Sequence, residues 1–342
     1  MSWSSNEVHL ASRPTGYPDA GTWSAVTVEV PEPGEGQFVV KVDHISLDPA
    51  MRGWLNDVRS YIPPVQIGEA MRAMCTGSVV ASRHPDFAVG DAVAGTFGVV
   101  EYALSDGTGV TTIDLGVAAA PTWLGALGMT GMTAYFGLHD VGRIKAGETV
   151  LVSAAAGAVG SVVAQLAKAE GCRVIGIAGG PDKVAWLKEI GLDEAIDYKS
   201  ENVLRRLREI APKGIDVYFD NVGGAILEAC ISRMKPHGVI ACCGMIATYN
   251  DATPTPGPSN LFELISRRIR MEGFLVMDFG SEFATARAAL EGWMNEGKLK
   301  AFTDVQEGFE NIPKTFLRIF SGANIGKQTL KVADPPLAVV GA

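Results

Sequence analysis

The sequence has few of the residues that bind metals or cross-link a chain. Its 342 residues include only five cysteines and five histidines, and no two cysteines form a C-x-x-C pair. An odd number of cysteines without such pairs argues against a disulfide framework and against a four-cysteine zinc site. No histidine pairs with a cysteine at the spacing of metal ligands, and the stretch around Cys75 contains no histidine. We therefore expect a protein that uses no metal.

Basic residues are also in the minority, because 29 lysines and arginines face 38 aspartates and glutamates, for a net charge of −9. This balance argues against a nucleic-acid partner, whose phosphates require clustered positive charge. The chain has no apolar run long enough to cross a bilayer, and its first residues lack the basic segment and apolar core of a secretory signal. The absence of a G-x-S-x-G stretch disfavours a serine hydrolase. We expect a cytoplasmic protein without a membrane partner.

What the sequence does contain is a change of pattern along its length. Residues 1–125 carry short apolar or alternating runs broken by proline, glycine and aspartate, which predicts a β-rich segment. Residues 126–300 alternate strand-like and helical runs, which is typical of βαβ units around a parallel sheet. Residues 301–342 return to strand-and-turn character. The sequence thus predicts an α/β protein in which a doubly wound domain interrupts a discontinuous β domain. In the doubly wound part, strands are expected over 149–153, 173–178, 195–198, 215–222, 238–244 and 270–274, and helices over 159–170, 183–190, 203–210, 225–234 and 282–296.

The first strand of the doubly wound part leads into a dinucleotide-binding fingerprint, G-x-G-x-x-G, in which Ala155 replaces the first glycine. Gly157 would allow the backbone to approach a pyrophosphate, and Gly160 would allow the following helix to pack closely on the strand. The N-terminus of that helix would offer its unpaired N–H groups to the anion. The methyl group of Ala155 is tolerated if its φ stays negative. We therefore predict dinucleotide binding.

The next strand distinguishes between the two nicotinamide cofactors. An NAD site usually ends this strand with an acid that holds the ribose hydroxyls. Here the strand "CRVIGIA" runs into Gly179, Gly180 and a proline, and no acid appears before Asp182. Lys183 follows, where its ammonium could bind a 2′-phosphate, and Tyr198 could supply a hydroxyl from the end of the following strand. The sequence predicts NADP(H), although an ordinary solvated lysine at position 183 is the alternative.

Taken together, the stretches "SLDPAMRGWL", "MTGMTAYFGL", "VLVSAAAGAVGSVVAQLAK", "YFDNVGG", "CGMIATYN", "RMEGFLV" and "GANIGK" resemble a known family over nearly the whole chain. They resemble the zinc-independent prostaglandin reductase or alkenal double-bond reductase family, which includes curcumin-type reductases, in the medium-chain dehydrogenase/reductase superfamily. The resemblance implies a GroES-like catalytic domain over 1–125 and 301–342, a Rossmann NADP-binding domain over 126–300, and a homodimer. It also implies NADPH-dependent reduction of the C=C double bond of a small α,β-unsaturated ketone or aldehyde.

The resemblance implies the site residues as well. The metal-binding positions of zinc-dependent relatives correspond here to Ser46, Leu47, Asp48, Gly68 and Glu69, in keeping with a metal-free site. The residues expected to hold the pyrophosphate are Gly157, Ala158, Val159 and Gly160, and those expected to reach the adenosine phosphate are Lys183 and Tyr198. The rest of the cofactor is expected to contact Asn221, Cys243, Gly244, Met245, Thr248, Tyr249, Phe274, Leu275, Val276 and Asn324.

The implied mechanism delivers a hydride to the β-carbon of the substrate. The ribose 2′-hydroxyl and Tyr249 stabilise the resulting enolate oxygen, and preorganised neutral donors can do this without a metal. Tyr249 could instead only cap the cofactor. The motif D-P-x-M-R has Ala50 at its third position, where family members often carry an aromatic residue, so the identity of the substrate does not transfer. Tyr61 could replace that ring in the substrate pocket or pack for structure alone. A quinone reductase and a non-catalytic, crystallin-like or regulatory dinucleotide-binding protein stay open as alternatives.

Overall fold

The computed structural model describes residues 2–335, which divide into two units. Unit 1 contains the described residues up to Leu124, the short segment Tyr249–Ala252 and those from Thr303 onward. Unit 2 contains Gly125–Thr248 and Thr253–Phe302. The sequence prediction gave all of 126–300 to the nucleotide domain, whereas the four residues 249–252 belong to unit 1.

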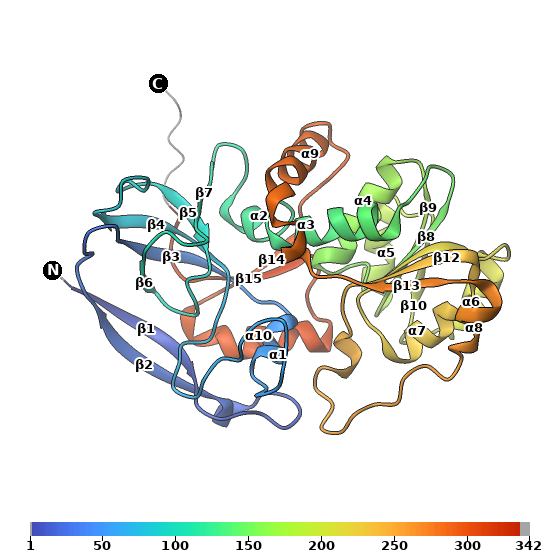
Figure 1. Cartoon of the computed structure of the whole chain (residues 1–342), viewed down its shortest axis with the longest axis horizontal. Helices are drawn as coiled ribbons and strands as arrows, with labels where there is room; N and C mark the ends of the chain where they lie inside the picture. Colours follow the sequence, from blue (N-terminus) through green and yellow to red (C-terminus); the bar gives the residue numbers. More distant parts are fainter. Residues whose placement is uncertain (1, 336–342) are drawn as a thin grey trace. The chain divides into compact units, whose positions relative to one another are not determined.

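Unit 2 is built around a six-stranded parallel sheet with the order β10-β9-β8-β11-β12-β13 (Figure 1). In chain order this is 3-2-1-4-5-6, the order of doubly wound dinucleotide-binding sheets. The strand order reverses between β8 and β11, which defines the topological switch point. The strands are β8 (Thr149–Ser153), β9 (Arg173–Ala178), β10 (Glu194–Asp197), β11 (Ile215–Asp220), β12 (Met234–Cys242) and β13 (Arg270–Gly273).

Helices cover both faces of this sheet, and in Figure 1 α4 and α7 lie on opposite sides of it. The central strands are therefore buried on both faces, which explains their continuous apolar sequences. The apolar core includes Leu151, Ile175, Tyr218 and Ile240, all with no exposed surface. The helices are α3 (Met129–Phe136), α4 (Ala158–Ala169), α5 (Pro181–Glu189), α6 (Val203–Ile210), α7 (Gly224–Ile231), α8 (Phe262–Arg267) and α9 (Phe283–Asn295).

Unit 1 contains a two-stranded sheet, β1-β2, and a seven-stranded sheet with the order β14-β15-β3-β4-β5-β7, in which β6 also pairs with β3. The central strand β3 is almost entirely buried, and Phe38 stacks on Phe87 in the core of this sheet. The strands are β1 (Trp3–Leu10), β2 (Trp23–Val30), β3 (Phe38–Ser46), β4 (Cys75–Ser82), β5 (Ala92–Gly95), β6 (Tyr102–Ser105), β7 (Thr111–Thr112), β14 (Thr303–Glu307) and β15 (Lys327–Lys331). The helices are α1 (Ala50–Trp54), α2 (Ala120–Leu124) and α10 (Ile312–Ser321).

The expectation of strand-and-turn structure throughout 301–342 is wrong, because α10 occupies ten of these residues. Its residues Ile312, Phe316 and Ile319 are buried at helical spacing, so the helix packs one apolar face against unit 1. Gly322 ends the helix in the left-handed conformation with φ of 67°. The apolar spacing and the glycine that ends the helix are visible in the sequence, but the helix spans only ten residues and is easily missed.

Candidate active site

In unit 2, every sequence-predicted cofactor residue follows the carboxyl end of a parallel strand. Parallel strands all end at the same edge of their sheet, so the structure brings the loops after these strands together at one edge. The loops after β8 and β11 flank the switch point, which is where open α/β sheets bind their ligands. The other predicted residues, Tyr61, Tyr249 and Asn324, belong to unit 1.

The loop after β8 tolerates an alanine in place of the first glycine of the fingerprint, because the φ angle of this alanine is negative. Ala155 is fully buried and is not among the residues with positive φ. The left-handed position of the turn falls instead on Ala154, whose φ is 48°. A non-glycine residue in this region carries strain, which is a feature found at ligand-binding turns.

Close packing at the start of α4 requires a glycine at position 160 and leaves little room for a side chain at position 157. A Cβ on Gly160 would lie 2.3 Å from the carbonyl oxygen of Ala154, and a Cβ on Gly157 would lie 3.1 Å from the same atom. The helix therefore begins directly against the loop, and its first N–H groups have no acceptor one turn earlier. This arrangement fits a pyrophosphate held by the backbone of residues 157–160.

A buried aspartate that the sequence prediction missed joins the loops after β8 and β11. Asp220 is 1% exposed and accepts hydrogen bonds from the hydroxyls of Ser153 at 3.0 Å and Tyr218 at 2.6 Å. It also accepts from the N–H groups of Val222 at 3.0 Å and Gly223 at 3.1 Å. The stretch "DNVGG" carried the signal, since an acid ends an apolar strand directly before a glycine turn.

The same network holds Asn221 and the loop after β12. The Asn221 side chain donates to the Ser153 carbonyl at 2.8 Å, and its backbone N–H donates to the Ser153 hydroxyl at 2.9 Å. The N–H groups of Cys243 and Gly244 donate to the carbonyl of Asp220 at 2.8 and 3.1 Å. Three loops at the switch point are therefore fixed by one set of hydrogen bonds.

The loop after β12 continues into a short 3-10 helix, Ile246–Thr248. Both the N–H and the hydroxyl of Thr248 donate to the carbonyl of Met245, whose side chain is 52% exposed. Burial raises the pKa of Cys242 and of Cys243 to about 12. These thiols are therefore protonated at neutral pH and unreactive.

At the expected adenosine end, β9 stops at Ala178 and no acid stands in the NAD position. Lys183 lies in the first turn of α5 and is half-buried. The ring of Tyr198 packs over Gly179, where an added Cβ would lie 2.8 Å from it. The structure thus brings Tyr198 to the turn that precedes the helix bearing Lys183.

Two further residues at this end were missed by the sequence prediction. The Lys199 side chain also packs against Gly179, 2.9 Å from an added Cβ, which brings a second lysine close to the turn. Asp197 accepts the N–H of Gly180 at 2.7 Å and that of Lys199 at 3.0 Å. The Gly180 N–H is the main reason why the pKa of Asp197 is lowered. Asp197 therefore fixes the turn.

The segment after β13 is anchored by aromatic packing. Phe274 is half-buried and meets Phe219 edge-to-face, with 6.2 Å between ring centroids. Gly137 makes room for this pair, since its Cβ would lie 2.4 Å from Phe274. Leu275 is 36% exposed, whereas Val276 is buried.

In unit 1, the three predicted residues differ in their surroundings. Tyr61 is 48% exposed, and its hydroxyl accepts a hydrogen bond from the Trp54 indole at 3.1 Å. Asn324 is buried and donates to the carbonyl of Gly326 at 2.9 Å. Tyr249 is half-buried in the segment Tyr249–Ala252.

Asp48, which the family resemblance predicts to correspond to a metal-binding position of zinc-dependent relatives, forms a partly buried ion pair here. The Lys327 ammonium, whose side chain is 2% exposed, donates to Asp48 Oδ1 at 2.6 Å and to the Leu47 carbonyl at 3.1 Å. The Ser46 hydroxyl donates to the other carboxylate oxygen of Asp48. Within residues 2–335, no cluster of three or more His, Cys, Asp or Glu side chains is arranged to hold a metal ion. No helix in that same part of the chain is long and apolar enough to cross a membrane.

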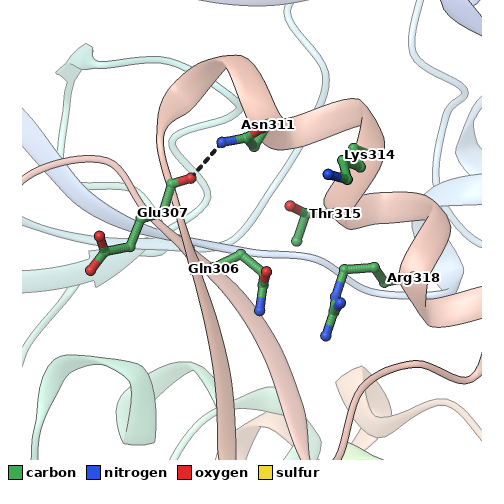
Figure 2. Close-up of a pocket in the computed structure, with 6 residues that line it drawn as sticks. All are labelled: Gln306, Glu307, Asn311, Lys314, Thr315 and Arg318. Atoms are coloured by element: carbon green, nitrogen blue, oxygen red, sulfur yellow. Dashed lines mark hydrogen bonds between the residues drawn. The ribbon is translucent and has the colours of Figure 1, made fainter.

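A small polar pocket of about 170 Å³ in unit 1 lies between β14 and α10 (Figure 2). Its polar groups bind one another or nearby side chains: Asn311 donates to the carbonyl of Glu307 at 2.8 Å, and Arg318 pairs with Asp304 at 2.9 Å. None of the sequence-predicted site residues lines it. These contacts link β14 to α10, so we interpret the pocket as part of the packing of unit 1.

A 3-2-1-4-5-6 sheet with a glycine turn at its switch point, joined to a discontinuous β unit, defines a dinucleotide-binding oxidoreductase of the medium-chain type. Two family models match the chain: an N-terminal domain of oxidoreductases over residues 6–113 and a zinc-binding dehydrogenase domain over residues 158–292. Together they cover most of both units.

Curated relatives match nearly the full chain. The NADPH-dependent curcumin reductase of Escherichia coli is 39% identical over 332 residues, which is 95% of this chain and 96% of the relative. The NADP-dependent 2-alkenal reductase of Nicotiana tabacum is 41% identical over 339 residues, 96% of this chain and 98% of the relative. The solved structure of CurA from Vibrio vulnificus in complex with NADPH is similar with a TM-score of 0.92 and 37% identity, over 96% of this chain and 100% of that one. The chain belongs to the zinc-independent prostaglandin reductase and alkenal reductase family of medium-chain dehydrogenases/reductases, so the family resemblance is confirmed.

Proposed function

We propose that the protein uses NADPH to reduce the C=C double bond of α,β-unsaturated ketones and aldehydes. The observation that carries this proposal is the nucleotide cradle of unit 2, by which we mean the loops after β8, β11 and β12. One hydrogen-bond network fixes these three loops, and no acid ends β9 in the position typical of NAD sites. The names of relatives that match more than nine-tenths of the chain, a curcumin reductase and a 2-alkenal reductase, support the same reaction class.

The chain's own groups would bind and orient the reactants. The backbone of residues 157–160 would hold the pyrophosphate, while Asn221 and the loops after β12 and β13 would contact the remainder. When bound, NADPH would supply a hydride to the β-carbon of the substrate, and a proton taken up at the α-carbon would complete the reduction. The half-buried ring of Phe274 would help to exclude water, which strengthens hydrogen bonds inside the site. Asn324, which is buried in unit 1, would contact the cofactor by its amide.

Tyr249 would donate a hydrogen bond to the oxygen that becomes negative when the β-carbon accepts the hydride. Loss of a single donor of this kind commonly lowers kcat by a factor of about 10 to 1,000. We expect Tyr249→Phe to lower kcat for an enone at least about tenfold while the protein still binds NADPH. An unchanged kcat would remove Tyr249 from the chemistry and leave it a residue that only caps the cofactor.

Lys183 would bind the 2′-phosphate of NADPH, with Tyr198 adding a hydroxyl and Lys199 a second charge. A charge-assisted contact contributes about 1.5–3 kcal/mol, which corresponds to roughly a ten- to hundredfold preference for NADPH over NADH. Lys183→Ala should reduce the ratio of kcat/KM for NADPH to that for NADH by this factor. Lys188→Ala, on the exposed last turn of α5, is the matched control and should leave the ratio unchanged. An unaltered ratio in Lys183→Ala would refute the assignment.

The substrate class can be tested by following NADPH oxidation with enals, enones, quinones and simple ketones. Turnover of enals and enones supports the proposal. We propose that the small side chain of Ala50 widens the pocket and that Tyr61 contacts the substrate. Turnover of quinones alone would favour a quinone reductase. Tight NADPH binding without turnover of any acceptor would favour a non-catalytic binding protein.

We also propose a homodimer formed through the edge strand β13. Among residues 2–335 this strand pairs with β12 alone, so its other side presents a sheet edge that can pair with a second copy. Six of the fifteen exposed large hydrophobic residues in the described chain fall in this short region. They are Leu261, Phe262, Ile265, Met271, Leu275 and Met277.

Light scattering after size-exclusion chromatography tests the dimer. Ile265→Glu, at a side chain that is 71% exposed, should give a monomer of half the mass, whereas Val89→Glu at an exposed position in unit 1 should not. A wild-type monomer at micromolar concentration would overturn the proposal.

A cytoplasmic location is proposed on the same footing, because all five cysteines are free thiols, as is usual in a reducing compartment. Localisation of a tagged chain by cell fractionation would test this.

A further inference from the structure

Arg52, in the stretch "DPAMR", is a buried arginine for which the proposed function gives no role. Its side chain is 3% exposed and lies in α1. The guanidinium donates hydrogen bonds to acceptors in three separate segments of unit 1. Nε donates to the Gly16 carbonyl and to Asn250 Oδ1, both at 3.1 Å, and Nη1 donates to Asn56 Oδ1 at 2.8 Å. Nη2 donates to the carbonyls of Pro14 at 3.1 Å and Gly16 at 2.8 Å.

The geometry of this contact requires an arginine. The planar guanidinium presents five N–H donors in a fixed fork, whereas a lysine presents three donors on one atom. Burial lowers the pKa of Arg52, but a guanidinium stays charged at neutral pH. A buried cation must keep its hydrogen bonds. Its contacts are therefore strong constraints on the segments that supply the acceptors.

The longest of these connections in sequence reaches the neighbour of Tyr249. Asn250 belongs to the segment Tyr249–Ala252. This segment is part of unit 1, although the residues before and after it in the sequence belong to unit 2. The turn that contains Gly16 packs on the same segment, since a Cβ on Gly16 would lie 3.7 Å from the Asn250 carbonyl oxygen. Gly16 has φ of 92°, which a side chain would strain. Arg52 thus joins α1, the turn at Gly16 and the segment with Tyr249.

We propose that Arg52 is a positioning residue that acts through Asn250 to hold the Tyr249 hydroxyl at the reacting oxygen. The proposal rests on the proposed role of Tyr249 as hydrogen-bond donor. It extends that role to a residue 197 positions earlier in the chain, since 249 minus 52 is 197. Misplacement of a catalytic group by about 1 Å can reduce the rate by as much as about a hundredfold, so a fixed segment matters for kcat.

The test compares variants in the wild-type chain and in the Tyr249→Phe background. Asn250→Ala removes one acceptor on a half-buried residue, and Arg52→Lys keeps the charge but loses the fork. We expect each to lower kcat for an enone by about three- to tenfold with little change in KM. In the Tyr249→Phe background, the same substitutions should lower kcat by less than about twofold, because groups that act as a unit are not additive. Asn250→Asp keeps the acceptor for Nε and should retain kcat within about twofold.

Arg13→Lys is the matched control, because Arg13 also fastens the end of α1, with hydrogen bonds in the described structure to the carbonyls of Leu55 and Val65. It should keep kcat near that of the wild type, and thermal unfolding of every variant checks that each one folds. If Asn250→Ala and Arg52→Lys keep their full effect in the Tyr249→Phe background, they do not act through Tyr249 and the inference is overturned. If Asn250→Ala has a normal kcat while Tyr249→Phe has a lowered kcat, the inference about Arg52 is overturned and the role of Tyr249 stands. A normal Tyr249→Phe would overturn both the role of Tyr249 and the inference.

Discussion

Asp220→Asn should destabilise unit 2 and weaken NADPH binding, because this carboxylate carries the hydrogen bonds that join the loops after β8 and β11. Four donors converge on its Oδ1: the hydroxyls of Tyr218 and Ser153 and the N–H groups of Val222 and Gly223. The Gly223 N–H also reaches Oδ2, at 3.2 Å. An asparagine keeps one acceptor oxygen but turns the other into a donor, which then faces this N–H group.

The magnitude follows from the change in charge. A hydrogen bond to a charged group contributes about 1.5–3 kcal/mol and a neutral one about 0.5–1.5 kcal/mol, so each of the four bonds loses about 1 kcal/mol. Part of this loss is offset, because a neutral amide is less costly to bury than a carboxylate. We expect the free energy of unfolding to fall by about 2–3 kcal/mol. Because the loops would be less ordered before binding, the Kd for NADPH should rise by about tenfold.

Urea unfolding followed by tryptophan fluorescence, together with NADPH titration, measures both quantities. Tyr218→Phe is the control, because it removes one donor but leaves the carboxylate charged. It should cost about 1.5–3 kcal/mol, because it removes one hydrogen bond to the charged carboxylate, and should leave the Kd within about twofold of the wild-type value. If Asp220→Asn unfolded at the same urea concentration as the wild type, the reasoning about the carboxylate would be refuted. Lower stability with an unchanged Kd would limit Asp220 to a role in folding.

Four other predictions use different parts of the fold. Gly160→Ala should lower the free energy of unfolding by about 1–3 kcal/mol, because its Cβ would overlap a backbone oxygen. At Gly292 in α9, an added Cβ would meet no described atom within 4 Å beyond its chain neighbours and its own helix backbone, so Gly292→Ala should instead stabilise by about 0.5–1 kcal/mol in the same denaturation assay. Burial alone would lower the pKa of His139, but the hydrogen bond and charge of Glu170 outweigh it and raise the pKa above 6.5. This pair therefore adds stability that is fully present below pH 6.5 and is lost as the pH rises through the raised pKa. In Glu170→Gln, the free energy of unfolding should depend less on pH in this range. Burial raises the pKa of all five thiols, so mass spectrometry should find the folded protein unmodified by an enal without NADPH, while the urea-unfolded chain is alkylated.

The alternation of strands and helices in unit 2 could be predicted because its elements are long and strongly patterned. The helix predicted over 203–210 has these bounds as α6, with Asn202 as its N-cap. The boundary between α7 and β12 was wrong: the helix was predicted to reach residue 234, whereas α7 ends at Ile231 and Met234 already begins β12. Between these elements stand only Ser232 and Arg233, with no glycine or proline to mark the end of the helix, so the sequence pattern extended the helix too far.

The loops of the nucleotide cradle could be predicted because glycine spacing and strand ends are local signals. The residues that fix those loops could not, since their partners are far apart in sequence. Asp220 reaches Ser153 across 67 positions, and Arg52 reaches Asn250 across 198. Asp197 presents the same difficulty, because an acid at the end of a strand is equally consistent with ribose binding, and only its hydrogen bond to Gly180 shows that it holds the turn.

The ion pair between Lys327 and Asp48 gives a physical reason why these positions suit a site without zinc. Zinc is bound by deprotonated thiolates, neutral imidazoles or free carboxylates. Here the Asp48 carboxylate already accepts a buried ammonium and the Ser46 hydroxyl. A divalent cation at this carboxylate would face the ammonium of Lys327 in a poorly solvated environment, where like charges repel strongly. The stretch "GANIGK" therefore contributes Lys327 to this ion pair, besides the cofactor contact proposed for Asn324. Its lysine places a fixed positive charge beside Asp48.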